Sequence, residues 1–228
     1  MEEINLPTYE GLRLKILKYW RIGFATYRRK SLKNTDFTII SNNCWGGMIY
    51  ESYNLPKQSP TIGMFFMAED YIKFLVDLKG YVNGKLTFIH PEQSRWKNAP
   101  QVVADKKFGT YPVGVLSNGK SEIEVFFLHY KSEQEARAKW ERRVQRINWD
   151  NLLIKFNDQN GCKQKNVEDF MNLKYKNKLF FTCKEWPGID RTSYIIIRQF
   201  FKDDFIRASY EPFGKSKYID LTKVLNHL

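Results

Sequence analysis

The sequence predicts an α/β protein with a mostly parallel sheet, helices on both faces of that sheet, and a basic amphipathic helix ahead of it. Short apolar runs alternate with helix-like stretches after residue 36, which is typical of parallel sheets. The 228 residues are 43% hydrophobic, enough to bury a full core. We therefore expect residues 1–36 to form the N-terminal helix and a linker, and residues 37–228 to form a single α/β domain.

The expected elements follow one another without an internal repeat or a low-complexity tract. Short apolar or β-branched runs are typical of buried strands, and apolar spacings of three and four are typical of helices. We expect strands at 37–40, 61–67, 85–89, 113–116, 122–130, 152–157, 178–183 and 193–199, and helices at 69–79, 133–147 and 167–173. Ligands of parallel sheets bind beyond the carboxyl ends of the strands, so the polar residues that follow these strands are candidates for a site.

The stretch from residue 9 to residue 33 is strongly basic. It contains eight Lys and Arg residues and one acidic residue, Glu10. An apolar stripe runs along the predicted helix at spacings of three and four; it consists of Leu12, Ile16, Trp20, Phe24 and Tyr27. Two interpretations remain open: the helix lies on an anionic membrane surface, or it docks on the domain core with its charges in water.

The formal net charge of +12 favours anionic partners: phosphates, nucleic acid or an anionic membrane. Nucleic acid is the least favoured, because no recognised DNA- or RNA-binding module is present. Cys44, Cys162 and Cys183 are an odd number without C-x-x-C spacing, so neither a disulfide framework nor a metal site is indicated. No signal peptide or membrane span is present, so we expect a cytoplasmic protein, with membrane association only at its surface. The sequence identifies no cofactor.

The first candidate site residues follow the strand at 37–40. Asn42, Asn43 and Cys44 lie at its expected carboxyl end, and Gly46 and Gly47 allow a tight turn into a helix. The first N–H groups of a helix attract an anion and lower the pKa of a nearby thiol. Cys44 is therefore a candidate nucleophile, although a free Cys is also a common small packing residue.

Two further strand ends carry candidate residues. His129 follows the run that begins at residue 122, and it is the one histidine of three in a position suited to a site. Asp158 follows the strand at 152–157, in a cluster of Asn, Asp and Gly that is also typical of a turn. We expect Asn42, Cys44, His129 and Asp158 to converge on one cleft.

The helix at 133–147 begins after a capping box formed by Ser132 and Glu135. At about 100° per residue, Arg143 falls on the same face as the apolar side chains, which include Trp140. A buried guanidinium needs a carboxylate, a phosphate or several carbonyls. We therefore expect Arg143 to bind either an internal acid such as Asp158 or a ligand.

Several separated motifs carry a resemblance to a known family. They are SNNCWGG (41–47) followed by Tyr50, SPTIGMFF (59–66), YPVG (111–114), FLHY (127–130) and KWERRVQRIN (139–148). Over about residues 30–185, the chain resembles the bacterial domain-of-unknown-function family whose members are described as exopolysaccharide (capsule) biosynthesis proteins. The resemblance implies a three-layer α/β fold and a role in surface polysaccharide synthesis. The matching positions are Asn42, Asn43, Cys44, Trp45, Gly46, Gly47, His129, Tyr130, Trp140, Arg143 and Asn148.

Three functions follow from these residues and the resemblance. In the first, a transferase or hydrolase acts on an activated sugar or glycan precursor, with Cys44 as nucleophile, His129 as its base and Asp158 in the same cleft. The expected ligand-binding residues are Asn42, Asn43, Gly46, Gly47, Tyr130, Trp140, Arg143 and Asn148. In the second, the same cleft binds a nucleotide sugar or glycan phosphate without chemistry. The third function, nucleic-acid binding, ranks last.

Overall fold

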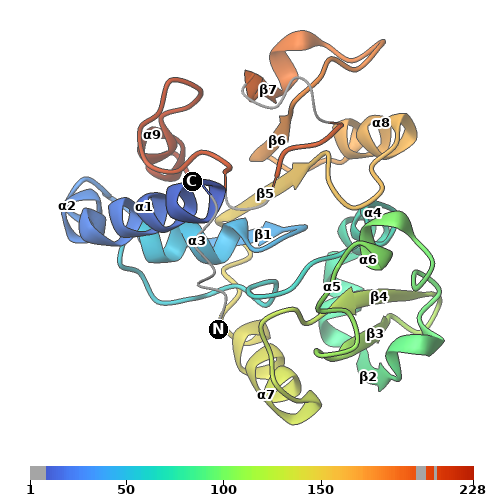
Figure 1. The fold of residues 1–228 in the computed structure, drawn as a ribbon. Coiled ribbons are helices and arrows are strands. Elements are labelled where there is room, and N and C mark those ends of the chain that lie inside the picture. The colour runs from blue at the N-terminus through green and yellow to red at the C-terminus, as the bar shows by residue number, and fades with distance from the viewer. Residues whose placement is uncertain (1–8, 199–203, 208–209) are drawn as a thin grey trace, which may run out of the picture.

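The computed structural model describes residues 9–198, 204–207 and 210–228, and its strands form two sheets (Figure 1). The first sheet is parallel, with the order β1-β5-β6-β7. Its strands are β1 (Thr38–Ser41), β5 (Leu152–Asn157), β6 (Lys178–Thr182) and β7 (Ile195–Ile196). The second sheet is antiparallel, with the order β2-β3-β4. Its strands are β2 (Lys85–Ile89), β3 (Val113–Ser117) and β4 (Glu122–Phe126).

The prediction of one mostly parallel sheet is therefore wrong for three strands. Only four residues connect β3 to β4, and a parallel pair needs a crossover of about a dozen residues or more. The connection contains Asn118 and Gly119, and Gly119 has the positive φ that tight hairpin turns require. Figure 1 shows β2, β3 and β4 set apart from the parallel sheet.

Successive side chains of a strand point to opposite faces, so neighbouring residues of β1 pack in two different cores. Ile39 of β1 packs in one core with α3 (Trp45–Ser52) and α9 (Leu221–Leu225). Its neighbour Ile40 packs in a second core with α4 (Ala68–Val76) and α8 (Gln164–Asn172), which extends to the antiparallel sheet. The remaining helices of the described chain are α1 (Tyr9–Gly23), α2 (Ala25–Lys30), α5 (Leu78–Asn83), α6 (Pro100–Val103), α7 (Glu133–Val144), η1 (Pro91–Gln93) and η2 (Arg191–Ser193).

The segment 61–67, predicted as a strand, contains turns and a single bridge between Phe65 and Phe126. Gly63 adopts a φ of +78°, which ends any extended run there. A Cβ at Gly63 would lie 3.1 Å from the Tyr130 ring, so the glycine permits close packing. The Gly63 carbonyl accepts a hydrogen bond from the His129 backbone N–H at 3.0 Å. This contact holds His129 in the loop after β4.

The N-terminal helix is interrupted at Phe24, between α1 and α2. Arg28 donates hydrogen bonds to the carbonyls of Trp20 and Arg21, which satisfies the end of α1. Leu14 and Leu17 pack on the core that includes α3. The helix therefore docks on the core, as one of the two interpretations expected, but not through the predicted stripe, whose five side chains are 50% to 73% exposed.

Candidate functional site

A cleft of about 460 Å³ lies where α1, α3 and α7 meet the segments around Gly63 and His129. Five of the predicted site residues line it: Cys44, Gly47, His129, Tyr130 and Arg143. The other lining residues are Lys18, Arg21, Met48, Glu51, Lys57, Ile62, Gly63 and Lys139. We call this space the basic cleft, because five of its side chains are Lys or Arg and only one is acidic.

Arg143 is 8% exposed, as its helical phase predicts. The Ser132 hydroxyl accepts a hydrogen bond from the Glu135 N–H at 3.2 Å, which fixes the start of α7 and therefore the direction of Arg143. The Arg143 Nη1 donates to the Tyr130 hydroxyl at 2.5 Å and to the Ile62 carbonyl at 3.2 Å. No carboxylate of the described residues pairs with it, so the alternative of an ion pair with Asp158 is wrong.

Arg21 reaches the same cleft from α1, and it is also 8% exposed. Its Nη1 lies 3.2 Å from the Met48 sulfur, and its Nη2 lies 3.7 Å from Glu51 Oε2. Its Nε is buried without a hydrogen-bond partner in the described part of the chain. Burial lowers the pKa of this guanidinium. An incompletely satisfied buried cation of this kind is suited to an anionic ligand.

The lysines add positive charge at the mouth of the cleft. Lys57 pairs with Glu51 at 2.8 Å, and Lys139 pairs with Glu135 at 2.5 Å along α7. Lys18 forms no salt bridge with a described residue. With one carboxylate among the lining residues, the cleft has an excess of positive charge and favours an anion.

His129 lies on the rim of the basic cleft with its side chain exposed. Partial burial, followed by the nearby Lys107 and Lys57, lowers the pKa of its ring. The imidazole is therefore neutral at pH 7 and can accept a proton. Among the described residues no hydrogen bond joins the His129 ring to Cys44; the Cys44 sulfur lies 3.9 Å from the Met64 carbonyl.

Cys44 caps α3, but its expected activation is contradicted. Burial, with a smaller contribution from Glu211, raises the pKa of the thiol to about 12. The N–H groups of Trp45 and Gly46, which would stabilise a thiolate, are bonded to the Asn43 side chain at 3.1 Å and the Ser41 hydroxyl at 3.2 Å. These donors are also not free to bind an anion. The thiol is therefore protonated at neutral pH.

Gly46 and Gly47 serve close packing rather than a tight turn. A Cβ at Gly46 would lie 3.1 Å from the Ser41 Oγ, and a Cβ at Gly47 would lie 3.1 Å from the Ile62 Cγ2. Neither glycine has a positive φ. The two glycines allow α3 to approach β1 and the segment around Ile62, which brings Cys44 to the wall of the cleft.

Asn42 and Asn43 do not line the basic cleft; they belong to a buried polar network at the carboxyl edge of the parallel sheet. Lys155 of β5 forms an ion pair with Glu211 and donates to Asn43 Oδ1 at 2.9 Å. Asn42 donates to Asn157 Oδ1 at 2.7 Å. Burial is the main influence on the pKa of Lys155 and lowers it, while the Glu211 carboxylate opposes this change. The strand ends are therefore filled by the protein's own polar groups.

Asp158 is buried beside this network. One carboxylate oxygen accepts hydrogen bonds from the Thr182 hydroxyl at 2.9 Å and the Cys183 N–H at 2.7 Å. The other accepts one from the Ile206 N–H at 2.8 Å. Burial raises the pKa of Asp158 despite these hydrogen bonds. Asp158 thus ties the end of β6 to the segment at Ile206, and the expected convergence of Asn42 and Asp158 with Cys44 and His129 on one cleft is wrong.

Trp140 and Asn148 also lie outside the basic cleft. Trp140 packs in the core, with its ring 6.5 Å from that of Phe74. Asn148 donates to the Asp36 carbonyl at 3.0 Å, and its backbone N–H donates to the Thr38 hydroxyl at 2.9 Å. It therefore joins the turn before β5 to the start of β1.

Sequence reasoning missed the cleft cations Lys18, Arg21, Lys57 and Lys139, and the buried pair Lys155 and Glu211. One signal was available for Lys155, because a lysine inside the apolar run of a central strand must be paired. Arg21 shares a helix face with Leu14 and Leu17, but the more aromatic stripe on the opposite face obscured that pattern.

Two features are absent from the described residues. Within residues 9–198, 204–207 and 210–228, no three His, Cys, Asp or Glu side chains come together in a way that could hold a metal ion. In the same ranges, no helix has the length and apolar character needed to cross a membrane.

Comparison with known proteins extends the similarity over nearly the whole chain. A protein of Haemophilus influenzae, described as an uncharacterized protein, is 33% identical over 224 residues, which cover 96% of this chain and 98% of that protein. The sequence profile of a domain of unknown function, DUF1919, matches residues 16–228. This match includes α7, the buried network and the C-terminal half of α1. The chain therefore belongs to the DUF1919 family.

Proposed function

We propose that this protein is a cytoplasmic, transferase-type enzyme of exopolysaccharide or capsule synthesis. In this proposal, the basic cleft binds the phosphate of an activated sugar or a glycan precursor. The observation that carries the proposal is the presence of two nearly buried guanidinium groups: Arg143 has no carboxylate partner among the described residues, and Arg21 pairs only with Glu51, at 3.7 Å. The assignment to polysaccharide synthesis is supported by the resemblance of the sequence motifs.

A phosphate suits these groups because its oxygens accept several charge-assisted hydrogen bonds from a planar guanidinium. In glycosyl transfer, the bond between the anomeric carbon and the phosphate oxygen breaks, and the phosphate leaves with the electron pair. Arg21 and Arg143 would stabilise the negative charge that develops on this leaving group. Neutral His129 would accept the proton of the attacking hydroxyl as the new bond forms.

Direct displacement fits the cleft better than a covalent intermediate on Cys44. A thiol with a pKa of about 12 has a negligible thiolate fraction at neutral pH. The same observation supports a second candidate function, in which the cleft binds a nucleotide sugar or glycan phosphate without chemistry. Nucleic-acid binding finds no comparable support.

The proposal is tested by titrating the full chain with a nucleotide sugar, for example a uridine diphosphate hexose, by calorimetry. Arg143→Gln should weaken binding by about tenfold to a hundredfold, since a hydrogen bond to a charged group contributes about 1.5–3 kcal/mol. The matched control is Arg142→Gln, one position earlier on α7 and exposed, which should change the affinity less than twofold. Equal affinities in the two variants would refute the cleft as the site.

Single-turnover product analysis then separates the two candidate functions. With bound nucleotide sugar and a glycan acceptor, an enzyme releases nucleoside diphosphate, whereas a binding protein returns the nucleotide sugar intact. His129→Gln should slow the formation of nucleoside diphosphate and leave nucleotide-sugar binding at pH 8 unchanged, because the ring is neutral there. Unchanged turnover in this variant would exclude His129 as the base.

A further inference from the structure

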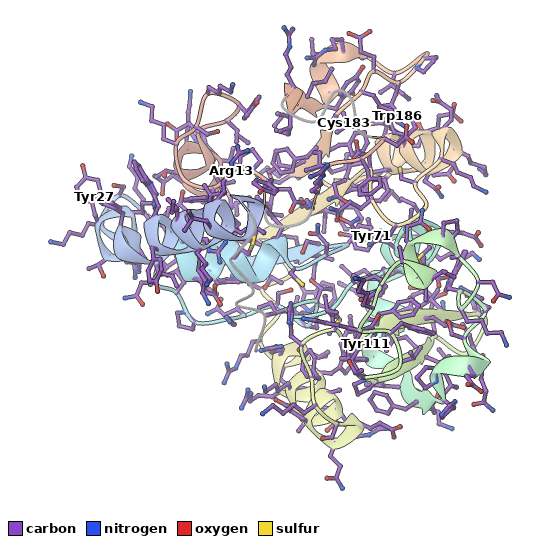
Figure 2. The ribbon with its side chains drawn as sticks, in the orientation of Figure 1. Arg13, Tyr27, Tyr71, Tyr111, Cys183 and Trp186 are labelled. Carbon is purple, nitrogen blue, oxygen red and sulfur yellow. The ribbon has the colours of Figure 1, made fainter. Side chains whose placement is uncertain are left out.

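The exposed apolar side chains of the protein are concentrated on its first two helices. Of the ten large hydrophobic side chains that are exposed in the described residues, seven lie between residues 12 and 27. Trp20 is 61% exposed and Tyr27 is 73% exposed. Figure 2 shows Tyr27 at the outer end of α2, pointing away from the body of the molecule. Such a concentration of exposed apolar side chains on two consecutive helices marks an interaction surface.

The patch lies opposite the face by which α1 packs on the protein. At about 100° per residue, Leu12 and Ile16 are each rotated by about 160° from Leu14. Leu14 and Leu17 pack on the core, whereas Leu12 and Ile16 are exposed. The apolar stripe is therefore an outward face of a docked helix, and it is not needed for the contact with α3.

Charge indicates what covers this face. Between residues 11 and 33 the sequence has eight Lys and Arg residues and no Asp or Glu. Arg21 and Arg28 turn inward to bind protein groups, while Lys15 and Lys30 are exposed. Protein interfaces are depleted in Lys, whereas helices that lie on anionic membranes combine Lys and Arg with Trp and other apolar side chains.

We propose that α1 and α2 dock the protein on an anionic lipid membrane, with Leu12, Ile16, Trp20 and Tyr27 entering the interface and the flanking lysines contacting anionic headgroups. Trp and Tyr favour this depth because each ring has an apolar body and a polar atom. The docking surface does not depend on the proposed function of the basic cleft. It requires neither a nucleotide sugar nor a reaction.

The test is flotation of the full chain with lipid vesicles. One preparation contains phosphatidylcholine alone, and the other contains phosphatidylcholine with about one third phosphatidylglycerol. The protein should float with the anionic vesicles at low salt and dissociate at high salt, because surface charges are screened. Equal binding to the two preparations, or no binding to either, overturns the proposal.

Matched variants locate the surface. Ile16→Ser/Trp20→Ser should weaken binding to anionic vesicles by at least about thirtyfold, since two exposed apolar side chains no longer enter the lipid. Val76→Ser/Val103→Ser, at positions that are each 69% exposed elsewhere, should leave binding unchanged. Lys15→Glu should weaken binding by at least about fivefold, and Lys120→Glu should not. Loss of binding in either control would contradict the assignment to this surface.

Three further measurements separate membrane docking from lipid binding in the basic cleft and from self-association. Vesicles with brominated acyl chains should quench Trp20, and Trp20→Phe, which keeps an apolar ring, should bind normally but lose most of that quenching. Arg143→Gln should bind vesicles as the unmodified chain does, which separates this result from the basic cleft. If gel filtration shows a dimer that Ile16→Ser/Trp20→Ser converts to a monomer, the face is an interface between two copies and the proposal is wrong.

Discussion

Removing the charge of Glu211 should strongly destabilise the protein, because Glu211 neutralises a lysine that has no access to water. The side chain of Lys155 is 0% exposed and that of Glu211 is 1% exposed. The Glu211 Oε1 also accepts hydrogen bonds from Asn43 at 3.0 Å and Asn157 at 2.9 Å. Glu211→Gln keeps the shape of the side chain but leaves the Lys155 ammonium without its counter-ion.

Breaking a buried ion pair in this way costs about 3–5 kcal/mol, and for a chain of this length each kcal/mol lowers the melting temperature by about 2–4 °C. Glu211→Gln should therefore lower it by about 6–20 °C in a thermal unfolding scan. Glu69→Gln is the control, because Glu69 pairs with Lys73 at the surface and such pairs contribute at most about 1 kcal/mol.

The double variant Glu211→Gln/Lys155→Met shows whether the unpaired charge of Lys155 causes the loss of stability. Since Met has nearly the length of Lys and carries no charge, the double variant should recover much of the stability lost in Glu211→Gln. Two results would refute this reasoning: a melting temperature for Glu211→Gln that matches that of Glu69→Gln, or a double variant that is no more stable than Glu211→Gln.

Two further predictions concern the basic cleft. Cys44 should react with iodoacetamide at pH 7.5 about a thousandfold more slowly than an exposed thiol, since its pKa is raised from 9.0 to about 12. Labelling of the native protein followed by mass spectrometry measures this rate. A rapid reaction of Cys44 would show that the thiol is activated. The affinity for sulfate, whose charge is constant between about pH 5 and 8, should rise as pH falls through the lowered pKa of His129, because the anion favours the protonated ring. In calorimetry, the sulfate affinity of His129→Gln should not change with pH. If the affinity of this variant still rises as the pH falls, a group other than His129 takes up the proton.

Local patterns in the sequence were sufficient to predict much of the fold. The apolar runs of β1, β5 and β6 and the capping residues of α7 are short-range signals, and the structure places these elements close to their expected bounds. The helical phase also predicted that Arg143 is buried. The division into two sheets was not predicted, although the Asn118–Gly119 turn between β3 and β4 was a local signal for an antiparallel pair.

The candidate site was harder to predict because it depends on which elements meet in space. Cys44 and His129 line one cleft although 85 positions separate them in the sequence. Asn42 and Asp158 follow strands as a site requires, but Asn42 belongs to the buried network around Lys155 and Glu211, and the hydrogen bonds of Asp158 go to Thr182, Cys183 and Ile206. The pKa of Cys44 depends on this burial, which no local pattern reveals.

The helix α1 contributes to both the basic cleft and the proposed membrane-docking surface, because its side chains point in three directions. Leu14 packs on the core, Lys18 and Arg21 line the basic cleft, and Ile16 belongs to the outward apolar face. If α1 lies on a membrane, Lys18 and Arg21 on its other faces lie within about one helix diameter of the lipid surface, about 10–12 Å. A phosphate carried on a lipid could then reach Arg21 and Arg143 without leaving the interface. This arrangement would account for the combination, in one short helix, of exposed aromatic side chains with a buried, incompletely paired arginine.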